Sequence, residues 1–342
     1  MKGVTKKRVK LKVDVADNAN HSLQYICENS RDSIKKTLDH FGVAIVPSVF
    51  SPEECDHMKD GMWSFLEQKS IGITRDNPES YKNFFKLLPS HSMLIQHWEI
   101  GHCQMVWDVR QNPKVVSVFS KIWNTQDLLV SFDGASFHMP HEETKRGYFK
   151  GNTWYHSDQR FSDSSFQCVQ GWVTAFDVTQ GDATLSIFEG SHKYHREFSE
   201  KFQLLGEKKD WYKMSSQEQV DFYVKEKKCQ VVDITCPAGS FVLWDSRTIH
   251  CGKEPEEGRK SSNFRCVAYT CYMPRTSATK KDIEKKRAAF KNKRTTSHWA
   301  NKAKLFGKKP NTFGAPGERP DFPGIPENEP VLTELGKKLA GF

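Results

Sequence analysis

A series of short strand-like segments between residues 127 and 274 limits the fold of this chain more than any other feature. The segments are rich in β-branched or aromatic residues, and Gly, Pro, Asp or Ser separates most of them. They are residues 128–132, 169–176, 184–188, 231–235, 240–244 and 264–272. Many short strands that follow leading helices indicate a closed or double sheet braced by those helices.

Helical patterns precede the strands, interrupt them once and follow them. Apolar residues recur at helical spacing in residues 31–41, and Gly42 then ends the pattern. Ser51-Pro-Glu-Glu supplies a cap residue, a proline at the first helical position and acidic residues in the first turn, so a helix is expected to about residue 68. Further helical stretches are expected at 111–123, in a charged insertion near 196–228 and at 279–293, before a Pro/Gly-rich tail at 310–330 and an apolar end that docks on the body.

The positive charge is concentrated at the two ends of the chain. The net charge is +9, and residues 1–12 carry six Lys/Arg and no acid. Residues 275–342 carry 16 Lys/Arg against seven Asp/Glu, which leaves 29 bases and 35 acids in residues 13–274. The acidic body argues against a nucleic-acid-binding domain, and the basic ends are either anion-binding segments or solvated arms.

Composition and cysteine spacing indicate a folded intracellular protein. The hydrophobic fraction of 37% is enough for a core, and the longest apolar runs last four residues, whereas a membrane span needs about 20. The basic N-terminus has neither the apolar stretch nor the cleavage site of a secretory signal. Nine cysteines form no CxxC pair, which argues against a disulfide framework and a structural zinc site. A cytoplasmic or nuclear location is therefore expected.

Two histidines and one aspartate form the strongest chemical pattern. His156 and Asp158 lie in a strand-like segment, where residues i and i+2 point to the same side. His250 follows at the far end of the apolar strand that begins after Pro237-Ala-Gly. Two imidazoles and one carboxylate on one face of iron leave three positions open, an arrangement typical of non-haem Fe(II) oxygenases. An α-keto acid takes two of these positions and dioxygen takes the third.

An arginine at the start of the next strand suits the cosubstrate of such an oxygenase. The distal carboxylate of the α-keto acid needs a buried cation, and a bidentate arginine fits it best. Arg265 begins a strand and shares a face with Val267 and Tyr269, so it can point into the sheet interior. Arg259 is the alternative, in a polar turn that is expected to be solvated.

In this order the motifs resemble the phytanoyl-CoA dioxygenase family of Fe(II)- and 2-oxoglutarate-dependent oxygenases. The resemblance covers about residues 30–274 and rests on GVAIVPSVFSPEEC, HSD, GDATLSIFEGSHKYH, PAGSFVLWDSRTIHCG and the arginine-led strand. It implies a mainly β fold with flanking helices, a double-stranded β-helix of the jelly-roll or cupin-like kind. It also implies that His156, Asp158 and His250 hold Fe(II), with 2-oxoglutarate and O2 as cosubstrates and ascorbate in support.

The resemblance assigns roles to residues around the iron as well. It places Trp172 near 2-oxoglutarate, and Gln170 shares its face, although core packing is an equal alternative for both. By the family's spacing Arg259 would bind 2-oxoglutarate, whereas local structure favours Arg265. The residues expected to line the substrate pocket flank the iron ligands and are Trp154, Tyr155 and Gln159.

The sequence therefore predicts a dioxygenase that converts 2-oxoglutarate to succinate and hydroxylates a small organic substrate. A carboxylate at position 158 argues against a halogenase, which needs a small residue there. Glu189 and Gln180-Gly-Asp-Ala depart from the family pattern; they touch no ligand but weaken any inference about the substrate. The expected organisation is a basic arm at 1–30, a jelly-roll dioxygenase domain at 31–274 and a basic helix with a Pro/Gly-rich extension at 275–342.

Three other functions stay open. The same chemistry on nucleic acid or protein would use the basic segment KKDIEKKRAAFKNKR to hold the substrate, and that segment also fits a nuclear localisation signal. A zinc hydrolase would share the metal ligands, but it would need a general base and have no use for Arg265. A non-enzymatic jelly-roll binding protein would be expected to lack one of His156, Asp158 and His250, and all three are present here.

Overall fold

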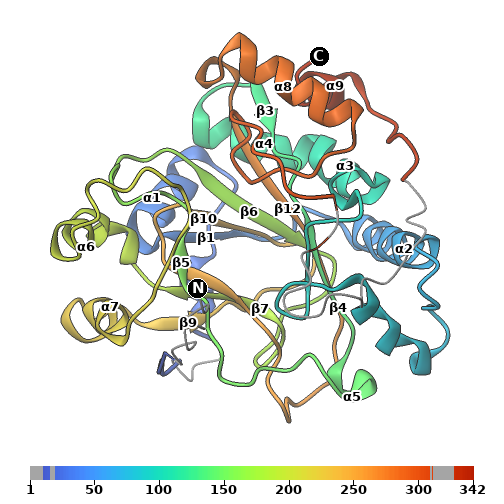
Figure 1. The fold of residues 1–342 in the computed structure, drawn as a ribbon, viewed down its shortest axis with the longest axis horizontal. Coiled ribbons are helices and arrows are strands. Elements are labelled where there is room, and N and C mark those ends of the chain that lie inside the picture. The colour runs from blue at the N-terminus through green and yellow to red at the C-terminus, as the bar shows by residue number, and fades with distance from the viewer. Residues whose placement is uncertain (1–10, 16–19, 309, 311–326) are drawn as a thin grey trace, which may run out of the picture.

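The computed structural model describes residues 11–15, 20–308, 310 and 327–342, and in these residues the strands form two antiparallel sheets (Figure 1). The larger sheet has the order β1-β10-β6-β12-β4-β2, with β3 also paired to β12, and the smaller has the order β8-β5-β11-β7-β9. The strands of the larger sheet are β1 (Val43–Val46), β2 (Leu94–Ile95), β3 (Leu128–Val130), β4 (Ala135–His138), β6 (Val169–Thr174), β10 (Phe241–Asp245) and β12 (Arg265–Pro274). Those of the smaller sheet are β5 (His156–Ser157), β7 (Thr184–Phe188), β8 (Tyr212–Lys213), β9 (Val231–Asp233) and β11 (His250–Lys253).

The two sheets share one apolar interior, and alternate residues of each strand point into it. On β10, Val242 and Trp244 pack with residues of the smaller sheet, whereas Phe241 and Leu243 pack with the helices. This alternation follows from the two-residue period of a strand. The predicted fold class, mainly β and jelly-roll-like with flanking helices, is confirmed.

Four helices cover the outer face of the larger sheet. They are α1 (Arg31–Phe41), α2 (Pro52–Gln68), α3 (Gln104–Gln111) and α4 (Pro113–Trp123). α1 ends at Gly42 with φ 78°, and α2 begins with a capping box between Ser51 and Glu54, as the sequence predicts. The chain also forms the short helices η1 (His21–Tyr25), η2 (Pro78–Leu87), η3 (Ile100–His102) and α5 (His141–Thr144).

The predicted insertion forms a small helical unit beside the smaller sheet. It contains η4 (Ser191–Tyr194), α6 (His195–Lys201), strand β8, α7 (Gln217–Asp221) and a π-helical turn, η5 (Phe222–Glu226). Phe198, Phe222 and Tyr223 form the centre of its apolar cluster. Strand β8 pairs with β5, so the insertion is joined to the strand that carries His156.

The basic C-terminal segment packs on the body. It forms η6 (Arg275–Ser277), α8 (Lys280–Lys291) and α9 (Glu334–Leu339), and Figure 1 shows α8 and α9 together near β3. Phe290 and Leu339 are buried in the main core, which confirms that the end of the chain docks. Of the predicted arm at 1–30, residues 1–10 and 16–19 lie outside the described residues, as does most of the tail at 310–330. No helix of the described chain is long and apolar enough to cross a membrane.

Candidate active site

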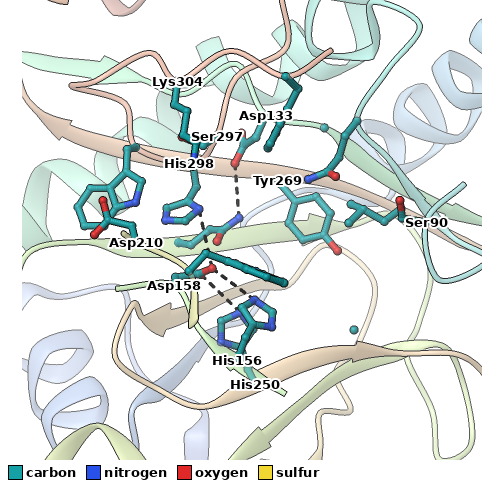
Figure 2. A pocket seen from close by; sticks show the side chains of 18 of the residues that line it. Ser90, Asp133, His156, Asp158, Asp210, His250, Tyr269, Ser297, His298 and Lys304 are labelled. Atoms are coloured by element: carbon teal, nitrogen blue, oxygen red, sulfur yellow. Dashed lines mark hydrogen bonds and ion pairs between the residues drawn. The ribbon is translucent and has the colours of Figure 1, made fainter. Parts of the chain in front are cut away.

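β5 and β11 bring together the three residues that the sequence pattern selects. The two strands are antiparallel neighbours, and His156 is the direct register partner of His250. Asp158 follows immediately after β5, with Oδ1 3.4 Å from His156 Nε2 and Oδ2 3.4 Å from His250 Nε2. The three side chains are buried, and their donor atoms lie within 4.8 Å of one another (Figure 2). They form the triad.

Backbone carbonyls fix the orientation of both imidazole rings. His156 Nδ1 lies 3.1 Å from the carbonyl oxygen of Trp154, and His250 Nδ1 lies 2.9 Å from that of Thr248. A carbonyl oxygen only accepts, so each Nδ1 carries a proton, and in the neutral imidazole the Nε2 lone pair is the one left for a metal. The Trp154 indole also stacks on the His156 ring, with centroids 4.8 Å apart and planes at 11°. Two imidazoles oriented in this way and a carboxylate fit the donor set of a non-haem iron centre.

Burial and charge favour the protonation states that metal binding requires. Burial by itself raises the pKa of Asp158, but the charges of His298 and His250 and the contact with His156 hold the pKa of that carboxyl well below its ordinary value. Burial lowers the pKa of His250 to about 4, against the opposing effect of Asp158. At neutral pH the carboxyl is therefore ionised and His250 is neutral.

A cavity of about 540 Å³ lies against the triad. Gln170, Trp244 and Tyr269, from strands of the larger sheet, form part of its wall. Another part comes from two further segments, residues 209–211 of the insertion and residues 297–306 of the C-terminal extension. These two segments form the rim of the cavity, and Figure 2 shows Ser297, His298 and Lys304 of the rim above the triad.

His298 is a site residue that no motif reveals. Its Nδ1 lies 3.9 Å from Asp158 Oδ1, and its Nε2 is buried without a hydrogen-bond partner among the described residues. The only signal in the sequence is the segment TTSHW after the basic helix. That segment is far from Asp158 along the chain, so only the packing of the extension brings the two side chains together.

Arg265 is buried on β12 and bonded to neutral groups. Its Nε donates to Ser136 Oγ at 3.1 Å, and its Nη1 donates to the carbonyl oxygen of Ala183 at 2.8 Å. The guanidinium carbon lies 5.2 Å from the centre of a Trp172 ring. No acidic side chain of the described residues forms an ion pair with it, so the guanidinium keeps its capacity for a ligand carboxylate. Arg265 does not itself line the cavity, but Tyr269 on the same face of β12 does.

Arg259 already has acidic partners. Its Nε donates to Glu142 Oε1 at 2.7 Å, and its Nη1 donates to Asp182 Oδ1 at 2.6 Å. The turn around it is exposed, as expected, but the Arg259 side chain itself is only 1% exposed. The paired carboxylates hold the guanidinium in the fold, which leaves little capacity for a ligand.

The other predicted site residues divide into two groups. Trp154 and Gln170 line the cavity, and Gln170 Nε2 lies 3.5 Å from Asp133 Oδ2. The structure places Tyr155, Gln159 and Trp172 behind the cavity wall. The Tyr155 hydroxyl is bonded to Ser186, the Gln159 amide bonds backbone carbonyls and a serine hydroxyl, and Trp172 packs between the sheets. Their polar atoms or rings are thus already used by the fold.

Comparison with known proteins places the chain among oxygenases. Residues 38–256 match the profile of the phytanoyl-CoA dioxygenase family. The chain is 27% identical over 265 residues, 75% of this chain and 82% of the relative, to the Ava biosynthesis cluster protein O of Aspergillus versicolor. Two solved structures share the fold at 13% identity. One is a candidate oxidoreductase from Salmonella typhimurium LT2, with a TM-score of 0.60 over 94% of this chain and 87% of that one. The other is the hypothetical protein JW0805 from Escherichia coli, with a TM-score of 0.57 over 93% and 85%.

Proposed function

Because the chain belongs to the phytanoyl-CoA dioxygenase family, we propose that it hydroxylates a small organic substrate in the cavity beside His156, Asp158 and His250. Family membership makes it a 2-oxoglutarate-dependent non-haem iron oxygenase. The observation that carries the proposal is the buried triad, which presents two imidazole Nε2 atoms and a carboxylate to a cavity of about 540 Å³. A cavity of this size suits a small molecule.

His156, Asp158 and His250 would hold the iron. The carbonyl contacts at Nδ1 keep both Nε2 atoms turned toward the metal position, and Trp244 Nε1 donates to Asp158 Oδ2 at 3.3 Å. When bound there, iron(II) supplies the dioxygen activation that couples decarboxylation of 2-oxoglutarate to oxidation of the substrate. The carboxylate at position 158 favours hydroxylation over halogenation, because a halide would take its place.

Arg265 would bind the distal carboxylate of 2-oxoglutarate. A buried guanidinium bonded only to a hydroxyl and a carbonyl can still form a charge-assisted pair, which Arg259 forms already with Glu142 and Asp182. Ser136 and Ala183 fix the direction of the Arg265 guanidinium.

The extension 275–342 would act as part of the active site of the dioxygenase domain 31–274. Residues 297–306 line the same cavity as the strands, which supports this role. The second candidate function is the same chemistry on nucleic acid or protein, because Lys302 and Lys304 of the basic extension stand at the cavity. If this second function is correct, substrate binding should weaken steeply as the salt concentration rises.

Turnover of 2-oxoglutarate tests the proposal. Protein purified under argon is mixed with Fe(II), 2-oxoglutarate and air, with and without ascorbate, and succinate is followed over time. Wild type is expected to form succinate slowly without substrate, and His156→Ala is expected to form none. No succinate, together with no Fe(II)-dependent binding of 2-oxoglutarate, would exclude the oxygenase and favour a binding protein or a zinc hydrolase.

A further inference from the structure

The rim carries three buried polar atoms that no group of the described residues satisfies. Among the described residues, Ser297 Oγ, His298 Nε2 and Trp299 Nε1 have no hydrogen-bond partner. All three residues line the cavity, and Ser297 and Trp299 are 8% and 3% exposed. Buried polar groups are normally bonded, so their gathering at a cavity wall points to a ligand. The serine O–H and the indole N–H are donors, which calls for a ligand with acceptor oxygens.

Lysines of the rim line the same cavity as these donors, as do the carboxylates of Asp133 and Asp158. Lys209, Lys302 and Lys304 line the cavity, and one acidic residue of the rim, Asp210, lies with its Oδ2 3.6 Å from Lys302 Nζ. Within the described chain, Lys209 and Lys304 form no ion pair. Two cations without acidic partners in the described chain, on the wall of the same cavity as these donors, favour an oxyanion over a neutral acceptor.

Trp211 provides an apolar surface beside the metal position. Its side chain is 49% exposed, although its ring centroid lies only 5.3 Å from that of His156. Its φ is 72°, a conformation that costs energy for a bulky side chain, and its backbone N–H donates to the carbonyl oxygen of Asp158 at 3.1 Å. A strained backbone that keeps an indole half exposed at the site indicates a binding surface, and an indole face favours an aromatic ring.

The rim lies away from the position expected for 2-oxoglutarate. Arg265 contacts Ser136 and Ala183 and does not line the cavity beside the rim. In Figure 2, Lys304 and Asp210 lie to the left, whereas Tyr269, which shares a face of β12 with Arg265, lies to the right. The rim therefore meets the substrate rather than the cosubstrate.

We propose that the rim recognises an aromatic acid. The oxyanion binds the Ser297 hydroxyl, the Trp299 indole N–H and the ammonium groups of Lys209 and Lys304, and the planar ring stacks on Trp211. This inference rests on the proposed function and names the substrate class of that site.

Paired probes of equal shape test the proposal. Protein loaded with Mn(II) and 2-oxoglutarate is titrated calorimetrically with naphthalene-2-carboxylate, 2-naphthyl phosphate and the neutral naphthalene-2-carboxamide. The carboxylate or the phosphate is expected to bind about tenfold more tightly than the amide, and the preference is expected to shrink with added salt. The tighter of the two acids then shows whether the site prefers a carboxylate or a phosphate.

Variants of the rim locate the interaction. Lys304→Gln and Ser297→Ala are expected to remove most of the preference for the acid, and Trp211→Ala to weaken acid and amide alike, with Trp211→Phe restoring binding. Lys291→Gln changes an exposed lysine of α8 outside the cavity and is expected to bind as wild type does.

Three outcomes overturn the inference. Acid and amide binding equally, or neither binding, excludes an oxyanion site, and an unchanged preference in Lys304→Gln excludes the rim as its location. Tight binding of a single-stranded oligonucleotide in place of the naphthyl acids favours the macromolecular substrate. Fe(II)-dependent absorption of bound 2-oxoglutarate is measured first, because its absence refutes the proposed function, whereas its presence without acid preference refutes this inference alone.

Discussion

The triad and the rim face the same cavity but are built in different ways. On the triad side, His156 and His250 are register partners in paired strands, and each ring is bonded to a backbone carbonyl. On the rim side, the chain is irregular, buried polar atoms lack partners among the residues that the structure describes, and Trp211 is half exposed with a positive φ. The sheet itself thus fixes the metal side, whereas recognition depends on segments that are not part of the sheet core.

The largest effect is expected on the triad side. His156→Ala should lower succinate formation by more than about a hundredfold, because even changes in the partners of metal ligands typically cost about 10- to 100-fold. Absorption of the Fe(II)–2-oxoglutarate complex under argon gives a second measurement, and it should be absent in this variant. His57→Ala, on the exposed face of α2, is the control. Normal turnover in His156→Ala would exclude the triad as the metal site.

The two arginines should respond in opposite ways. Arg265→Leu should raise the KM for 2-oxoglutarate about a hundredfold with little loss of stability, since truncating one partner of a buried charge pair costs about 2–5 kcal/mol. Arg259→Leu should change that KM little but lower the melting temperature, because it leaves Glu142 and the buried Asp182 without their cation. A raised KM in Arg259→Leu alone would reverse the assignment.

The C-terminal extension, which carries one of the two rim segments, should be destabilised by one buried lysine. Burial lowers the pKa of Lys286 on α8 to about 7, and its Nζ donates to the carbonyl oxygen of Val130. The folded protein therefore binds this proton less well than the unfolded chain does, so the cost of the buried charge is complete below about pH 7 and disappears as pH rises toward 10.5. Lys286→Met should stabilise the protein by about 2 kcal/mol at pH 6.

That gain should shrink steadily between pH 7 and pH 10, which urea unfolding of variant and wild type at several pH values can measure. Lys285→Met, at the exposed neighbouring position on α8, is the matched control and should show no such dependence. A gain that stays constant with pH would mean that Lys286 keeps an ordinary pKa in the folded state.

The smallest effect is expected where the rim meets the triad. His298→Ala should reduce the kcat of succinate formation about tenfold and leave the KM for 2-oxoglutarate within about twofold, because His298 contacts Asp158 but is not itself a ligand. His298→Asn keeps a polar group and should recover part of the loss. An effect as large as that of His156→Ala would place His298 among the metal ligands.

Much of the fold could be predicted because its signals are local. The cap at Ser51, the stop at Gly42 and the alternating residues of β10 each depend on a few neighbours, and the structure has these elements within a residue or two of their predicted bounds. β2 and β8 have two residues each, too few for a periodic pattern. They exist because neighbouring strands supply their hydrogen bonds, and sequence spacing carries no trace of that pairing.

For the site itself, the sequence alone determined the residue types of the triad and their family context, because His156 and Asp158 share one short motif and His250 ends a recognisable strand. Only the tertiary structure gave Arg259 its acidic partners and brought His298 to Asp158. The physical reason is that the state of a charged side chain depends on its partners. Those of Arg259, Glu142 and Asp182, come from distant parts of the chain, and only folding brings them within hydrogen-bond distance.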